Sequence, residues 1–158
     1  MFEFEVKDGA RTLQFNGKLL GESTSFKRGS TRWIEFKLYI TESGSYVLSR
    51  IGVSLIYHGA ACQLVRNYNL HDLAFDKLSP GSIPCDRCYP TEEADLVFPE
   101  KHRHWAQVSD NPTAILEALY KYDDHGSKYL TGVAQRLLES SGKQDPGIQS
   151  VYNYEIIP

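Results

Sequence analysis

The chain has 158 residues, a length typical of one folded domain, and its 41% hydrophobic and 23% charged residues exclude an intrinsically disordered chain. The net charge of −3 gives no general attraction to nucleic acid. No segment approaches the ~20 apolar residues of a membrane span, so no membrane association is expected. The start of the chain lacks a secretory signal pattern and three cysteines leave one unpaired, so we expect reduced thiols in the cytoplasm.

The first part of the chain has the alternating pattern of antiparallel strands. Apolar residues alternate with polar residues in the segments 2–6 and 13–15. The dipeptide Asn16-Gly17 then predicts a tight hairpin turn, because both residues tolerate positive φ. The polar, glycine-flanked stretch 21–31 is predicted to be a loop or a frayed strand edge.

A second hairpin is predicted over residues 32–57, where aliphatic residues recur at every second position. A turn closed at Ser43-Gly44 pairs Ile40 with Val47. In this register nearly all aliphatic residues of both strands share one face, and a shift of one residue would expose them.

The end of the chain is predicted to be helical. The sequence Ser109-Asp110-Asn111-Pro112 supplies a helix cap and a proline for the first turn. One helix is predicted to run from there to the stop at 123–126, and a second from about 127 to 141 with Gly142 as its C-terminal stop.

These patterns predict an α+β fold, in which an N-terminal antiparallel β-meander packs with a C-terminal αα-hairpin. Residues 1–158 are predicted to form a single domain. Within it, residues 1–108 are β-rich, residues 109–142 are helical, and residues 143–158 form a C-terminal tail or strand.

The pair Cys85 and Cys88 is the most distinctive chemical feature of the sequence. Two cysteines three positions apart in a proline-bounded loop can bind one tetrahedral ion, as in structural zinc sites. Two more ligands are needed, and His102 and His104, which lie on the same side of an extended segment, are the first candidates. The alternative to a zinc site is a pair of ordinary loop thiols or a redox pair. Further candidate ligands are His58, Cys62 and His71.

Aromatic and cationic side chains share one face of the predicted hairpin. Aromatic rings stack on ligands, and cations pair with carboxylate or phosphate, so this face is predicted to bind a protein or an acidic ligand. The alternative is an ordinary half-buried sheet face. The predicted contact residues are Trp33, Lys37, Tyr39, Tyr46 and Arg50.

Glu35 and Lys37 have the Glu-x-Lys spacing of metal-dependent nuclease cores. That mechanism also requires a second carboxylate on a neighbouring strand, which the predicted hairpin register does not supply. The sequence therefore predicts a non-catalytic binding or accessory module, with a structural zinc clip in the loop 84–104. The alternative is a metal-dependent hydrolase that acts on nucleic acid or a nucleotide through Glu35 and Lys37.

Overall fold

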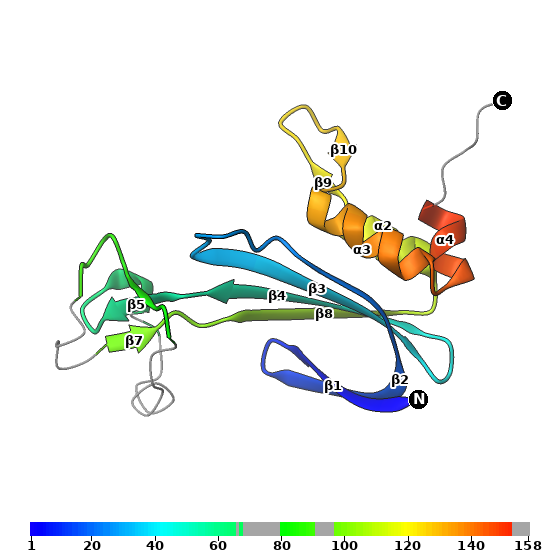
Figure 1. Ribbon diagram of the computed structural model, residues 1–158, viewed down its shortest axis with the longest axis horizontal. Helices are drawn as coiled ribbons and strands as arrows, with labels where there is room; N and C mark the ends of the chain where they lie inside the picture. Colours follow the sequence, from blue (N-terminus) through cyan, green and yellow to red (C-terminus); the bar gives the residue numbers. More distant parts are fainter. Residues whose placement is uncertain (66, 68–79, 91–96, 153–158) are drawn as a thin grey trace. The chain divides into compact units, whose positions relative to one another are not determined.

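The protein has a five-stranded antiparallel sheet and C-terminal helices, which confirms the predicted α+β class (Figure 1). The strand order is β1-β2-β3-β4-β8, so the first four strands form the predicted meander. The strands are β1 (Phe2–Asp8), β2 (Arg11–Thr24), β3 (Arg32–Thr41), β4 (Tyr46–Ser54) and β8 (Arg103–Ser109). The computed structural model describes residues 1–65, 67, 80–90 and 97–152.

The chain divides into two compact units. Unit 1 comprises Met1–Phe26, Ile34–Ile51 and Arg103–Pro158, and unit 2 comprises Lys27–Trp33 and Gly52–His102. Unit 1 also contains α2 (Pro112–Leu119), β9 (Lys121–Tyr122), β10 (Lys128–Tyr129), α3 (Gly132–Gly142) and α4 (Pro146–Tyr152). Unit 2 also contains β5 (Ile56–Gly59), the 3-10 helix η1 (Gln63–Val65), β6 (Ile83–Pro84) and β7 (Val97–Pro99). Among the described residues, no helix combines the length and apolar character needed to cross a membrane.

Unit 1 buries hydrophobic side chains on both faces of its sheet. The larger cluster lies where the three helices cover one face, and Leu38, Leu48, Ile115 and Leu137 are fully buried in it. The opposite face curls around a smaller cluster that includes Tyr39 and its aromatic neighbours. The curl brings the end of β1 to β8, where the backbone N–H of Gly9 donates to the carbonyl oxygen of His104 at 2.8 Å.

The turn between β3 and β4 sets a register that differs from the predicted one. The backbone N–H of Thr41 donates to the carbonyl oxygen of Ser45 at 2.7 Å, and Gly44, with φ of 91°, donates to Thr41. A glycine in the left-handed region lengthens the turn to three residues, which shifts the pairing by one. Tyr46 therefore lies in the helix-covered cluster and Val47 on the opposite face, so the prediction of one shared aliphatic face is wrong.

The prediction of a hairpin turn at Asn16-Gly17 is also wrong. Both residues lie inside β2, and the turn between β1 and β2 is made at Gly9, which has φ of 60°. Gly17 pairs with Thr41 of β3, and a Cβ at this position would clash with the carbonyl oxygen of Ile40. Gly17 is therefore explained by the close approach of a neighbouring strand rather than by a turn. The predicted loop 21–31 likewise begins later, because β2 continues to Thr24.

The two predicted helices exist, but both are shorter than expected. Helix α2 starts at Pro112 as predicted, with Asn111 as its cap, and ends at Leu119 because the next residues pair in the β9–β10 hairpin. Helix α3 begins at Gly132, after the cap Thr131, and ends at the predicted stop Gly142.

The C-terminal segment forms a third helix where a tail or strand was expected. Asp145 explains why α4 starts there. Its Oδ2 accepts a hydrogen bond from the backbone N–H of Ile148 at 2.9 Å and another from the hydroxyl of Tyr46 at 2.6 Å. Burial and this hydrogen bond to Asp145 raise the pKa of Tyr46 to about 12. Residues 153–158 lie outside the described residues.

Candidate metal centre

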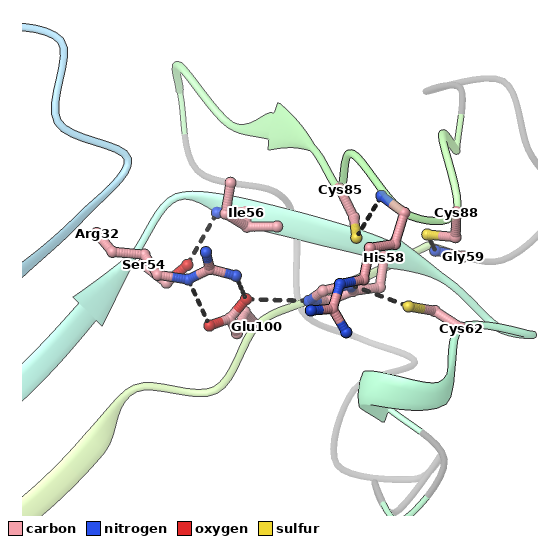
Figure 2. Close-up of polar contacts among 10 residues, drawn as sticks. Arg32, Ser54, Ile56, His58, Gly59, Cys62, Cys85, Cys88 and Glu100 are labelled. Carbon is pink, nitrogen blue, oxygen red and sulfur yellow. Dashed lines mark hydrogen bonds and ion pairs between the residues drawn. The ribbon is translucent and has the colours of Figure 1, made fainter.

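One histidine and three cysteines of unit 2 lie close together (Figure 2). The Nδ1 or Nε2 atom of His58 and the Sγ atoms of Cys62, Cys85 and Cys88 all lie within 4.8 Å of one another. Cys88 is half-buried, the other three side chains are buried, and all three thiols are free. Imidazole nitrogen and thiolate sulfur are metal ligands, so this group could hold a metal ion.

Strand β5 positions the histidine half of the group. It is the central strand of a three-stranded sheet with the order β6-β5-β7, and it carries His58 next to its last residue. The chain then reverses, because the backbone N–H of Cys62 donates to the carbonyl oxygen of Gly59 at 3.0 Å. This turn brings Cys62 Sγ within 3.4 Å of His58 Nδ1.

Strand β6 positions the cysteine pair. It runs parallel to β5, and the backbone N–H of Cys85 extends this pairing by donating to the carbonyl oxygen of Tyr57 at 2.9 Å. The N–H of Tyr89 donates to the carbonyl oxygen of Cys85 at 2.9 Å, and Tyr89 has φ of 47°, so the chain makes a tight turn around Cys88. The two sulfurs are thereby presented to the same point as His58.

Backbone N–H groups point at the sulfurs. The N–H of Arg87 donates to Cys85 Sγ and the N–H of Gly59 donates to Cys88 Sγ, each at 3.4 Å. Burial opposes ionisation of Cys85, but hydrogen bonds from the backbone N–H groups of Arg87 and Cys88 outweigh it and lower its pKa to about 7. Burial raises the pKa of Cys88, and its neighbours Cys62 and Cys85 add to this effect. Donors fixed on a sulfur stabilise the thiolate, which is the form that binds a metal.

A carboxylate fixes the orientation of the histidine ring. His58 is fully buried, and its Nε2 lies 3.1 Å from Glu100 Oε2 (Figure 2). Arg32 holds Glu100 by two hydrogen bonds, of 3.0 and 2.8 Å. Burial raises the pKa of Glu100, but Arg32 and His58 together lower it below its usual value. An ionised Glu100 accepts a hydrogen bond from Nε2–H, and in this tautomer the Nδ1 lone pair faces Cys62 and is available to a metal.

Replacing Glu100 by alanine is expected to weaken metal binding by about 10–100-fold, because His58 loses the group that fixes its tautomer and ring orientation. The measurement is a competition titration of the purified variant against a chromophoric chelator. Asp86→Ala is the matched control, since Asp86 is an exposed carboxylate of the same unit, between the two cysteines. Equal affinities of the two variants would show that Glu100 does not position His58.

The structure brings together only part of the predicted metal site. Cys85 and Cys88 are joined by His58 and Cys62, which were among the further candidates, and not by His102 or His104. His104 belongs to β8 in unit 1. The candidate ligands therefore span residues 58–88 rather than the predicted loop 84–104. His71 lies outside the described residues.

The five residues predicted to form a binding face do not share one face. Tyr46 is buried in the helix-covered cluster, whereas Tyr39 is buried in the cluster on the opposite face of the sheet. The shifted register of β3 and β4 explains this separation. In the strand register, Lys37 lies opposite Glu22 of β2. Trp33 belongs to unit 2.

Glu35 and Lys37 lie on β3, as predicted, opposite Thr24 and Glu22 of β2. Glu22 is a carboxylate residue on a neighbouring strand, but it lies opposite Lys37 rather than opposite Glu35. Within the described part of the chain, however, only the His/Cys group brings three or more potential metal ligands together. The hydrolase alternative stays a prediction without a metal site to support it.

The His/Cys group offers four ligands, with backbone and carboxylate groups that fix them. Such an arrangement can hold one ion and cross-link three separate segments of unit 2. Its function has to be inferred from this chemistry. The sequence matches no protein-family model and no curated protein, and the structure matches no solved structure.

Proposed function

We propose that this chain is a non-catalytic binding or accessory module in which a structural zinc ion organises unit 2. His58, Cys62, Cys85 and Cys88 are the proposed ligands. The observation that carries the proposal is the approach of their four ligand atoms to within 4.8 Å of one another in a largely buried setting. Zinc binds such Cys₃His sets tetrahedrally, and three thiolates favour it over the harder ions Mg²⁺ and Ca²⁺.

The number of protein ligands supports a structural rather than a catalytic ion. Catalytic zinc sites keep one position open for water or substrate, and they use three protein ligands. Four ligands complete a tetrahedron and leave no position for a substrate. The ion would then act by joining β5, the turn after it and the loop after β6.

The charge of the site also suits a divalent ion. Three thiolates and a neutral imidazole around Zn²⁺ carry a net charge of −1. The hydrogen bond to Glu100 is the main cause that raises the pKa of Arg32. The nearby Cys85 and Asp86 raise this pKa further, so Arg32 lies close to the site. A cation beside the site lowers the cost of burying an excess negative charge. Free thiols in a zinc site fit a reducing compartment, and we propose a cytoplasmic location on that basis.

Elemental analysis of the chain, purified without chelator or added metal, tests the proposal. We expect about one equivalent of zinc per chain, because structural zinc sites bind too tightly to lose the ion during purification. Less than about 0.2 equivalents of zinc in protein with three reduced thiols would overturn the proposal. Stoichiometric iron in place of zinc would also overturn it.

A further inference from the structure

Unit 1 contains a pocket that the metal centre does not involve. Its volume is about 250 Å³, and all of its lining residues belong to unit 1. Phe36 forms one wall from the sheet, Trp105 another from β8, and Leu119 and Tyr120 lie at the end of α2. Trp105 remains 38% exposed, so part of its ring is accessible to a ligand. The walls are therefore mainly apolar and aromatic, as in small-molecule sites.

The charged groups of this pocket all have the same sign. Arg50 and Lys121 line it, and no aspartate or glutamate does. Arg50 is half-buried, and within the described part of the chain its guanidinium has no hydrogen bond or ion pair. A guanidinium next to apolar walls gains most from a carboxylate, which it can bind through two parallel hydrogen bonds.

The first turn of α3 also contributes to the lining of the pocket. Thr131 and Val133 line it, and Thr131 caps the helix by accepting a hydrogen bond from the N–H of Ala134 at 3.3 Å. The end of α3 that borders the pocket is thus its N-terminus, the positive end of the helix dipole.

We propose that this pocket binds a small organic acid with an apolar body, whose carboxylate pairs with Arg50. The volume limits the ligand, because 250 Å³ is below the ~300–1,000 Å³ of pockets for drug-sized molecules and above the ~150 Å³ that holds benzene. One aromatic ring or one short branched chain fits this size. The body packs against Trp105 and Phe36. This inference does not rest on the zinc proposal, since no metal ligand lines the pocket.

Isothermal titration of the purified chain with 3-phenylpropionate and with 4-methylpentanoate tests the proposal. At least one acid is expected to bind with a dissociation constant below about 1 mM. The uncharged amide of the same acid and acetate, which lacks the apolar body, are expected to bind at least about tenfold more weakly. The indole N–H resonance of Trp105 should shift on saturation with the acid.

Variants of Arg50 test whether the carboxylate of the bound acid pairs with this residue. Arg50→Gln is expected to weaken acid binding at least about tenfold, Arg50→Lys to retain part of the affinity, and the matched control Arg28→Gln to leave it unchanged. Arg28 is an exposed arginine of unit 2 that does not line the pocket. Absence of saturable binding of both acids up to about 10 mM would overturn the proposal. Equal affinities of the unmodified chain for the acid and for its amide would also overturn the proposal.

Discussion

Removal of the proposed zinc ion from the purified chain is expected to unfold unit 2 while unit 1 stays folded. The cores of the two units explain the difference. Among the described residues, five buried side chains make up the hydrophobic cluster of unit 2, and two of them, Cys62 and Cys85, are proposed ligands. Within the same described part of the chain, the helix-covered cluster of unit 1 contains thirteen buried residues and no cysteine. A small core without its metal is the situation in which structural zinc supplies the folding free energy, about 10–16 kcal/mol in zinc-finger peptides.

Hydrogen exchange read out by mass spectrometry measures this difference. After treatment with a strong chelator under reducing conditions, the amides of β5, β6 and β7 should lose at least about 100-fold in protection, which corresponds to ~2.7 kcal/mol of local stability. Peptides from α2 and α3 should keep their protection from exchange. Adding back one equivalent of zinc should restore protection in unit 2. Unchanged exchange in a chain shown to be free of metal would contradict the structural role of the ion.

Cys62→Ser is expected to abolish stoichiometric metal binding, to below about 0.2 equivalents per chain. A serine hydroxyl has nearly the same shape, but it is not deprotonated at neutral pH and is a poor zinc ligand. Cys62 is also the ligand whose sulfur lies 3.4 Å from His58 Nδ1, so its loss opens the site on the histidine side. The variant should show the exchange pattern of the chelated protein, and further chelator should change nothing.

Ile56→Val is the control for loss of packing in the same unit. Ile56 is 8% exposed in the cluster of Cys62 and is not a ligand. This substitution should cost about 0.5–1.5 kcal/mol of stability and leave the zinc content at one equivalent. If Cys62→Ser retained one equivalent of zinc, Cys62 would not be a ligand, and the four-ligand site would be wrong.

The candidate metal site could be predicted from the sequence only where its candidate ligands are close together in the chain. Cys85 and Cys88 are three positions apart, so their spacing alone indicates a metal loop. His58 and Cys62 reach them through the parallel pairing of β5 with β6, in which Ile56 lies opposite Ile83. No sequence pattern predicts that pairing, because β6 is two residues long and the two strands are far apart in the chain. The sequence did contain one signal for this half of the site, because His58 lies four residues before Cys62 at the end of an apolar segment.

The fold shows the same division between local and non-local information. The alternation of residues 32–57 predicted strands correctly, because each strand needs only its own buried face. The register was wrong by one, because it depends on whether Gly44 closes a turn of two or three residues. Asn16-Gly17 has the sequence of a turn but lies in a strand, where the carbonyl of Ile40 excludes a side chain at Gly17.

X-ray absorption at the zinc edge of the purified protein determines the type, number and distance of the zinc ligands directly. We predict three sulfur ligands at about 2.3 Å and one nitrogen ligand at about 2.0–2.1 Å, with no bound water. These are the ligands that Cys62, Cys85, Cys88 and His58 provide. A spectrum with fewer than three sulfur ligands, or with oxygen in the first coordination sphere, would contradict a closed structural site.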